Sequence, residues 1–556
     1  MTVNPTRRAL LTAGGLSLAS IALAGCTGGS AGGGSGGGGS KSINAFNGGS
    51  GQFTNGFNPF LPTATNPGFR GMVYEPLMFF NQSKANDIQP WLAKSYELSK
   101  DGRTITFTLK SGVRWTDGTP FTSKDVVYTF GLIKKYPALN TNGLVFDSIT
   151  APDDATVVIR TGRPAFTDLW YLAGQTYIVP EHLWTKVSDP TTEANTKPVG
   201  TGAFTLQTFS AQSFLMKKNP TYHEGSVSLE SVRFVSYSGN GPATAALIAG
   251  QLDWAGIFIP DVQKAFVSRD PKNNHYQLAT STLVTYLVPN LTKFPLSELP
   301  VRRAMNVAID RETLNKQAFS GYNLQPSRVL TLTPRDDQYV AAAFRGPIGF
   351  DTAGAKKILT SAGYKQGADG IFADGQGRKV TMKCLVITGY TDYISALQLI
   401  GENLKAAGIG FSSQEVSLAS FGVSRSQGQF DILIDAAAGG PGVFYLYNTL
   451  LNSKLTAPVG KTATSDFARF QDAKVDQLLG QMASTADQTV ITKAAQDIQA
   501  IVAERVPYVA LVQRTDLVEY RTANVSGFPA KDDPYAGAGP SGSPDVGIVA
   551  RRLKPV

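Results

Sequence analysis

The stretch "IQPWLAKSYELSKDGRTITFTLKSGVRWTDGTPFTSKDVVYTF", residues 88–130, decides the fold class of the chain. Apolar and polar residues alternate from Ile105 to Leu109, which predicts a β-strand. Asp-Gly and Ser-Gly pairs, which favour tight turns, interrupt the stretch at 101–102, 111–112 and 117–118. A further strand is expected from Val113 to Trp115. The stretch therefore predicts a small β-meander.

A helix is predicted directly after the meander. Thr122 or Ser123 can cap its first turn, where the negative charge of Asp125 is also favourable. The apolar residues that share one of its faces are Val126, Val127, Phe130 and Ile133. The string "DATVVIR", residues 154–160, then returns to a strand pattern.

Farther along the chain, helices alternate with strands. "VRRAMNVAIDRETL", residues 301–314, has an apolar helical stripe at Val301, Ala304, Met305, Ala308 and Ile309. The charges of Arg302, Arg303 and Arg311 are expected to face away from this stripe. Two more amphipathic helices, 353–364 and 394–408, and a buried strand, 430–436, follow. Alternating helices and strands indicate an α/β protein, and the Gly/Pro/Ser-rich tail 528–544 is expected to lie on the surface.

Composition excludes several classes of protein. A length of 556 residues with 42% apolar content is enough for three or four domains with their own cores. The net charge of +9 is spread along the chain without Lys/Arg runs, so nucleic acid is not expected as a partner. Two cysteines cannot form a disulfide framework, and His182, His223 and His275 lack metal-ligand spacing. We expect neither a metal nor a cofactor.

The first 40 residues are typical of an exported lipoprotein. Residues 1–25 read as an export signal, with Arg7 and Arg8 before a short apolar stretch that is too diluted for a permanent membrane span. Leu23-Ala24-Gly25-Cys26 resembles a bacterial lipobox, which makes Cys26 a lipid anchor. The paired arginines leave both twin-arginine and ordinary export open. Residues 26–40 are the anchor and a linker in which nine of the fourteen residues after Cys26 are glycine, so we expect a coil spanning on the order of 20 Å.

Several strings in order resemble one family. They are "FNPFL", "VYEPLMFFN", the 88–130 stretch, "KPVGTGAFTL", "AGQLDWAG", "FPLSELPVRRAMNVAIDRETL", "AKKILTSAGY" and "ERVPYVAL". Together they resemble the extracytoplasmic solute-binding proteins of ABC importers, in the cluster that handles peptides and oligosaccharides. The resemblance implies an α/β clamshell of two lobes and three domains joined by a two-segment hinge. Domain I is then 41–85, 198–298 and 506–556, domain II is 86–197, and domain III is 299–505.

The same resemblance implies a function. The protein would be a monomeric, non-enzymatic binding protein that delivers a short oligomer to ABC permease subunits from the outer face of the bacterial cytoplasmic membrane, with the lipid as its only membrane contact. A stand-alone sensing lipoprotein remains an alternative. An exported glycan hydrolase is a remote one, because its candidate carboxylates Asp431 and Asp435 lie roughly 13 Å apart on a strand, farther than glycosidase chemistry requires.

The ligand class is predicted from one segment, "FDILIDAAAGGPGVFYLYNTLL", residues 430–451. The peptide-binding branch of the family holds the ligand ammonium with an aspartate, and the resemblance places Gly439 at that position. Asp435 either substitutes for the aspartate or caps a neighbouring backbone group. The string "GGP" followed by Phe444, Tyr445 and Tyr447 resembles instead the branch that binds β-linked oligosaccharides, which need no buried counter-charge.

The sequence therefore favours a neutral sugar over a peptide and nominates a set of ligand-binding residues. They are Trp254, Phe258, Asn240, Asn290, Asp435, Gly440 and Tyr445. For Trp254 the alternative is core packing, in which case its replacement would lower stability and leave affinity unchanged. For Asn240 and Asn290 the alternative is an ordinary turn or loop role. No catalytic residue is expected.

Overall fold

The computed structural model describes residues 41–49, 51–61, 64–82, 84, 87–541 and 544–556. The predicted export signal, the linker and Cys26 lie outside the described residues. Within the described part, the search for membrane-crossing helices finds none with the length and apolar character required.

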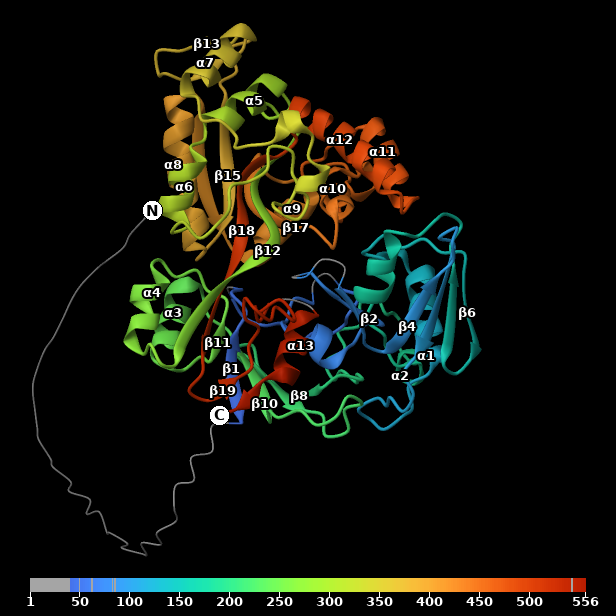
Figure 1. Cartoon of the computed structure of the whole chain (residues 1–556). Coiled ribbons are helices and arrows are strands. Elements are labelled where there is room, and N and C mark those ends of the chain that lie inside the picture. Colours follow the sequence, from blue (N-terminus) through green and yellow to red (C-terminus); the bar gives the residue numbers. More distant parts are fainter. Residues whose placement is uncertain (1–40, 50, 62–63, 83, 85–86, 542–543) are drawn as a thin grey trace, which may run out of the picture. The chain divides into compact units, whose positions relative to one another are not determined.

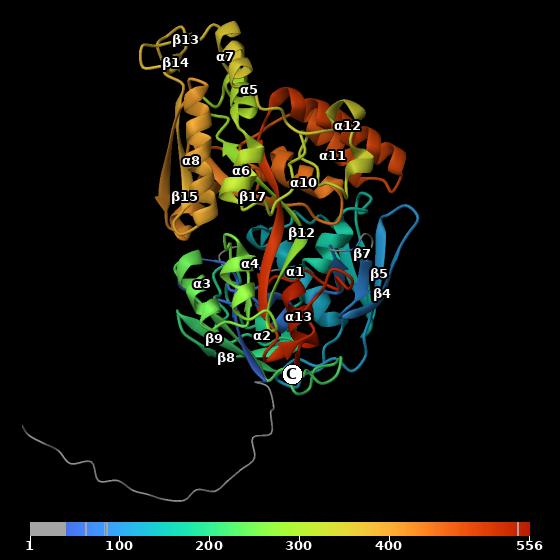
Figure 2. The same ribbon diagram turned by 60° about the vertical axis from the view of Figure 1, so that its left-hand side comes forward.

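One ten-stranded mixed sheet runs through the described chain. Its strands, in spatial order, are β16 (Gly410–Val416), β15 (Thr381–Ile387), β17 (Ile432–Ala438), β12 (Asn274–Pro289), β18 (Val509–Arg521), β11 (Trp254–Ala255), β1 (Ser42–Phe46), β10 (Ser231–Val235), β9 (Ser213–Lys218) and β8 (Phe204–Phe209). The long strands β12 and β18 run together between β11 on one side and β17 on the other (Figures 1 and 2).

The register of β12 against β18 changes where the two strands cross between the two halves of the sheet. Thr280 pairs with Thr515, but the next pair is Val284 with Gln513. Three residues of β12 therefore oppose one residue of β18, and such a bulge bends the ribbon and increases its twist. We call residues 41–279 and 516–556 the first lobe and residues 284–513 the second lobe. Two strands thus connect the lobes, in agreement with the two-segment hinge implied by the family resemblance.

A separate four-stranded sheet lies inside the predicted domain II. Its order is β4 (Ala93–Leu98), β5 (Thr104–Leu109), β7 (Thr156–Arg160) and β6 (Ser148–Asp153). The predicted strands at 105–109 and 154–160 are therefore confirmed. The predicted strand from Val113 to Trp115 is wrong, because this segment forms only an isolated bridge between Arg114 and Pro120.

The predicted helix after the 88–130 meander is α1 (Ser123–Lys135). Thr122 caps it and Asp125 completes a reciprocal capping box, so two backbone donors of the first turn are satisfied. The side chains of Val126, Phe130 and Ile133 are buried against the small sheet.

The remaining elements surround the two sheets. In the first lobe they are β2 (Met78–Asn81), β3 (Asp87–Pro90), α2 (Glu181–Trp184), α3 (Asn240–Ile248), α4 (Val262–Ala265), β19 (Val525–Ser526), α13 (Asp545–Arg552), β20 (Lys554–Pro555), two π-helical turns (Phe69–Val73, Trp170–Gly174) and two 3-10 turns (Pro137–Leu139, Val267–Arg269). In the second lobe they are α5 (Leu299–Ala308), α6 (Arg311–Ala318), α7 (Thr352–Ser361), β13 (Lys365–Gln366), β14 (Phe372–Ala373), α8 (Thr391–Ala406), α9 (Leu418–Gln427), α10 (Val443–Leu451), α11 (Ala473–Ala483), α12 (Gln488–Arg505) and three 3-10 turns (Asp337–Tyr339, Ala342–Phe344, Ser453–Leu455).

Two arginines expected on the surface are buried. Arg302 is 7% exposed, and its guanidinium donates to the carbonyl oxygens of Leu296, Ser297, Arg505 and Val506. Arg311 is 3% exposed and donates to the carbonyl of Ala510, among others. The expectation that their charges face away from the core is therefore wrong, because backbone carbonyls from a distant part of the chain satisfy their donors.

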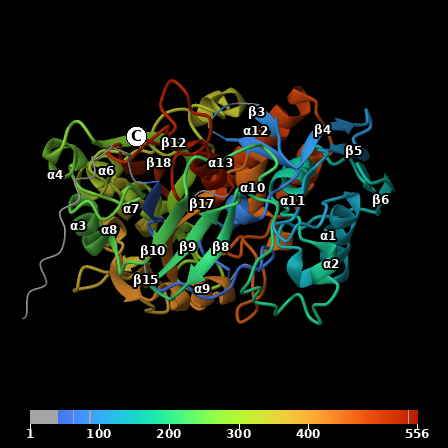
Figure 3. The same ribbon diagram turned by 90° about the horizontal axis from the view of Figure 1, so that it is seen from below.

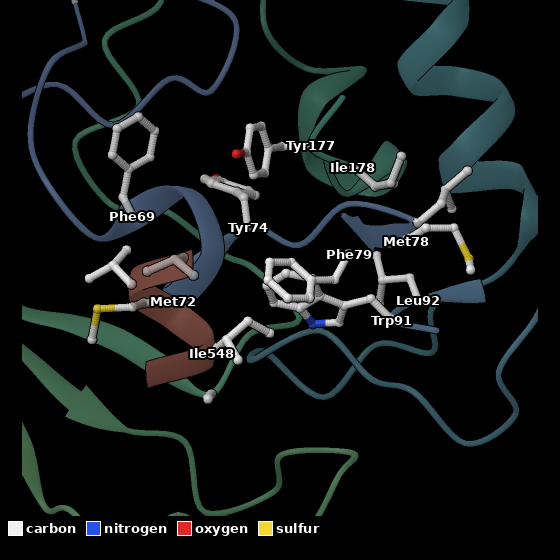
Figure 4. Close-up of a cluster of buried hydrophobic side chains, with 14 of the residues drawn as sticks. Phe69, Met72, Tyr74, Met78, Phe79, Trp91, Leu92, Tyr177, Ile178 and Ile548 are labelled. Carbon is white, nitrogen blue, oxygen red and sulfur yellow. The ribbon is translucent and has the colours of Figure 1, made fainter. Parts of the chain in front are cut away.

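The first-lobe core surrounds a buried carboxylate. Phe79, Trp91 and Leu92 pack together in this core (Figure 4), and Glu75 is 0% exposed beside them. Its carboxylate accepts from Trp91 Nε1 (2.6 Å), Thr201 Oγ1 (2.7 Å) and Tyr222 OH (2.8 Å), and lies 3.0 Å from His223 Nε2. Burial acts to raise the pKa of Glu75, but the hydrogen bonds and the charge of His223 outweigh it, so the pKa lies below 4.5.

Candidate functional site

The two lobes touch through an aromatic contact at the start of α10. Tyr445 of the second lobe donates its hydroxyl to the carbonyl oxygen of Thr167 in the first lobe, at 3.0 Å. The rings of Trp170 and Tyr445 meet edge to face, with centroids 4.8 Å apart, and Tyr171 lies 5.5 Å from Tyr445. These residues join a π-helical turn of the first lobe to a helix of the second.

Gly440 makes this contact possible because it has no side chain. A Cβ at Gly440 would lie 2.6 Å from the Trp170 indole and 2.8 Å from the Tyr445 ring. Arg335 holds the loop that contains Gly440 in place. Its guanidinium donates to the Gly440 carbonyl at 2.5 Å and is paired with Asp336 at 2.8 Å. The second lobe therefore offers a flat backbone surface to the indole.

A second interlobe contact lies at the N-termini of α3 and α8. The Asn240 amide donates to the Thr391 hydroxyl at 3.1 Å, and a Cβ on Gly239 would lie 3.0 Å from the carbonyl oxygen of Gly389. Asn240 is 9% exposed. Its side-chain amide thus forms a hydrogen bond between the two lobes and does not only stabilise a local turn.

A small cavity of about 60 Å³ lies at the strand crossing. Its lining residues are Gly256, Ile257, Phe258, Phe319, Tyr322, Asn323, Asp392, Arg514, Thr515 and Leu517. Phe258 packs edge-on against Tyr322, whose hydroxyl accepts from the backbone N–H of Val262 and donates to the carbonyl of Ile259. Phe258 is therefore the predicted site residue that lines the hinge.

The acids beside these contacts have cationic neighbours. Asp435 lies 2.8 Å from Arg425 and also accepts from the Ala436 backbone N–H. Next to Trp170, Asp168 lies 2.9 Å from Arg163. At the hinge cavity, burial raises the pKa of Asp392, and the positive charge of Arg514 partly opposes this shift. Among the described residues, the interlobe region therefore presents compensated charge.

Two buried hydrogen-bonding atoms beside the aromatic contact, and one in the second-lobe core, have no hydrogen-bond partner among the described residues. They are Trp170 Nε1, Thr167 Oγ1 and Tyr286 OH. Tyr286 pairs with Asp435 across β12 and β17, and burial together with the Asp435 charge holds the pKa of Tyr286 well above its usual value. Because unpaired buried donors are costly, these groups stand out from the rest of the interior.

Two of the predicted site residues are structural instead. Trp254 is 0% exposed in the first-lobe core, and its Nε1 donates to the Ala538 carbonyl at 2.8 Å. Asn290 is 0% exposed, and its amide donates to the carbonyls of Gly428 and Phe430. These contacts agree with core packing for Trp254 and with a loop role for Asn290. The described part of the tail is not wholly a surface extension, because Tyr535, Ala536 and Ala538 are buried and the Ala538 carbonyl accepts from Trp254 Nε1.

The structure adds Trp170 and Tyr171, which no sequence signal distinguished. They lie in "FTDLWYLAG", residues 166–174, without a motif or a periodicity that points to a site. Gly440, Tyr445 and Asn240 lie at the lobe contacts and Phe258 at the hinge cavity, whereas Asp435 lies on β17 with partners in the second lobe. The search for clusters of at least three His, Cys, Asp or Glu side chains able to hold a metal finds none in the described ranges.

Comparison with known proteins identifies relatives across most of the chain. Residues 87–456 match the family model "Bacterial extracellular solute-binding proteins, family 5 Middle". Protein XP55 of Streptomyces lividans is 29% identical over 428 residues, which are 75% of each chain. The glutathione-binding protein GsiB of Salmonella typhi is 26% identical over 467 residues, 81% of this chain and 85% of that one.

A solved structure shares the fold over nearly the whole chain. It is the mannohexaose-bound periplasmic oligopeptide-binding protein of an oligopeptide ABC transporter from Thermotoga maritima, with a TM-score of 0.85 and 22% identity. The match covers 93% of this chain and 98% of that one. This similarity confirms the α/β fold of two lobes and three domains.

Proposed function

The chain belongs to the bacterial extracellular solute-binding proteins of family 5, and we propose from this premise that it is the lipid-anchored substrate-binding component of an ABC uptake system for short, neutral, β-linked oligosaccharides. Family members are extracytoplasmic proteins that bind peptides or oligosaccharides for ABC importers. The family resemblance in the sequence is thereby confirmed. The neutral ligand and the anchor are the parts proposed here.

The Asp435–Arg425 ion pair is the main observation in favour of a neutral ligand. A peptide bound between the lobes brings an ammonium group, which needs an unpaired carboxylate because burying a lone charge costs several kcal/mol. Asp435 is the acid closest to the position expected of a peptide anchor, and Arg425 already neutralises it at 2.8 Å. Gly439 offers no side chain at that position.

The aromatic contact supports a sugar. Sugar rings present apolar faces that pack on aromatic side chains, and their hydroxyls both donate and accept hydrogen bonds. Trp170, Tyr171 and Tyr445 supply the rings, and the unpaired Trp170 Nε1 supplies a donor. The mannohexaose in the Thermotoga maritima relative agrees with this chemistry.

An oligopeptide is the second candidate, favoured by the glutathione-binding relatives. Titration calorimetry with matched panels of cello-oligosaccharides and di- to pentapeptides separates the two. We expect heat from the sugar panel and none from the peptides. Binding of peptides alone would contradict the proposal of a neutral ligand. The absence of heat with both panels would contradict the proposed ligand class.

Closure of the lobes links binding to transport. A guest that contacts both lobes shifts the equilibrium toward the closed form, and reversing a 1:99 ratio takes about 5.5 kcal/mol of differential affinity. Gly440→Val places methyl groups where Trp170 and Tyr445 meet. The clash with Trp170 arises only when the lobes meet, so ligand affinity should fall about 5- to 150-fold, or about 1–3 kcal/mol. The clash with Tyr445 lies within the second lobe, and its effect on stability is read from the melting temperature.

Gly442→Ala is the matched control for this variant. Its added Cβ lies 3.9 Å from the Tyr445 ring, which is ordinary contact. Affinity is measured by calorimetry and stability by melting temperature. Equal affinities of Gly440→Val, Gly442→Ala and the natural chain would show that the indole contact does not form on closure.

The anchor and the cellular role follow from the sequence and the family. We place the protein, as a monomer, on the outer face of the cytoplasmic membrane, held by lipid on Cys26 and working with ABC permease subunits. Cys26→Ser should release it into the medium, and retention at the membrane would reject the anchor. Product formation from labelled oligosaccharide would instead support the remote hydrolase alternative, although Asp431 and Asp435 both lie beside cations, Lys293 and Arg425.

A further inference from the structure

A group of basic side chains lies where the described chain begins. Lys41 directly precedes β1, and its carbonyl accepts from the Glu230 backbone N–H at 2.7 Å. Ser42 of β1 pairs with Ser231 of β10, which in turn pairs with Lys217 of β9. The first residue of the body is therefore held beside the lysines of β9. We define the basic surface as Lys41, Lys217, Lys218 and Arg233, which lie on or beside the neighbouring strands β1, β9 and β10.

Lys217 and Arg233 share the outer face of the sheet. Arg233 pairs with Leu215, two residues from Lys217, so both side chains project from the same side of the strands. The opposite side carries Phe214 and Phe234, both 0% exposed in the core. Seen from below, β8, β9 and β10 lie toward the viewer (Figure 3). Lys41 and Lys217 are exposed to solvent.

One acid, Glu230, lies among these lysines. Lys218 binds its carboxylate at 2.6 Å. The pKa of Glu230 is lowered, first by the hydrogen bond from Lys218 and then by the charges of Lys218, Lys41 and Lys217. Glu230 neutralises one of the four basic residues, so the surface keeps a positive excess.

The C-terminus also lies toward this end of the molecule. Val556 donates its backbone N–H to the Asn524 carbonyl, and the Asn524 amide donates to Asp253. Asp253 also accepts from the backbone N–H of Asn44 in β1. The C-terminus therefore lies near the start of β1, as Figures 1 and 2 show.

We propose that the basic surface binds the anionic headgroups of the membrane to which the protein is tethered. The inference rests on the proposed lipid anchor, because Cys26 precedes Lys41 by fifteen residues. The glycine-rich composition of the linker predicts a span on the order of 20 Å. A tether of this length would keep the basic surface close to the bilayer. Attraction acts within the Debye length of about 8 Å at physiological salt, and each basic residue near an anionic surface contributes about fivefold to binding.

Vesicle co-sedimentation tests this surface without the lipid. The protein is the mature chain from residue 26 carrying Cys26→Ser, so neither signal nor lipid contributes. We expect binding to phosphatidylcholine vesicles that contain phosphatidylglycerol, little binding to pure phosphatidylcholine, and loss of binding in high salt. The triple variant Lys41→Gln/Lys217→Gln/Arg233→Gln should bind the anionic vesicles about 100-fold more weakly.

The control removes three exposed lysines elsewhere, Lys357→Gln/Lys405→Gln/Lys474→Gln on α7, α8 and α11. Equal weakening by both triple variants would show a general charge effect and overturn the proposal, as would binding that ignores lipid charge or salt. Melting temperature confirms that both variants fold. Sugar binding by calorimetry should be unchanged in both, so a failure here is distinguishable from a failure of the proposed ligand.

Discussion

Replacing Trp254 with alanine should lower the free energy of unfolding by about 3–5 kcal/mol and leave ligand affinity nearly unchanged. The indole is fully buried in β11, packs edge-on against Phe528, and donates to the Ala538 carbonyl. Its removal leaves a cavity and an unpaired carbonyl. Scanning calorimetry measures the stability, and titration calorimetry measures the ligand affinity.

Trp254→Phe is the control, because it keeps an aromatic ring and loses only the Nε1 hydrogen bond. It should cost about 1 kcal/mol for the hydrogen bond plus a smaller cavity. If Trp254→Ala lowered ligand affinity and left the melting temperature unchanged, the result would support the other alternative from the sequence, in which Trp254 binds the ligand.

Glu75→Gln has the second large expected effect, a loss of about 2–4 kcal/mol of stability at neutral pH. The carboxylate accepts from Trp91, Thr201 and Tyr222, and lies beside His223. An amide replaces one acceptor oxygen with a donor, which then faces other donors. Glu224→Gln is the matched control. Glu224 lies next to the same cluster, since its partner Arg551 donates to Tyr222, so the variant tests whether the loss is specific to the buried carboxylate.

The same carboxylate predicts an acid dependence. The folded pKa of Glu75 is lowered from 4.5, so its stabilising effect is present above about pH 4.5 and is lost as pH falls through the lower folded value. Melting temperatures of the natural chain should therefore fall more steeply below pH 4.5 than those of Glu75→Gln. Parallel curves would show that the carboxylate is not ionised in the folded protein.

Local features of the fold were predictable from the sequence because they depend on neighbouring residues. The cap at Thr122, the apolar stripe of α5 and the buried strand β17 follow from spacings of a few positions, and the structure confirms each.

Features that depend on distant partners were not predictable. Arg302 is buried because Arg505 and Val506, about 200 positions away, offer it carbonyls. Trp170 meets Gly440 across the two lobes, and neither position has a local pattern that signals the contact. Asp435 could be nominated from its segment, but its neutralisation by Arg425 depends on how α9 packs beside β17.

Native mass spectrometry of the protein purified under mild conditions tests the central claim most directly. The account predicts a one-to-one complex whose extra mass equals a whole number of hexose or pentose units, and release of the same intact oligomer on denaturation. A retained peptide, or a sugar recovered only as shorter fragments after incubation, would contradict a protein that binds an uncharged oligosaccharide and passes it on unchanged.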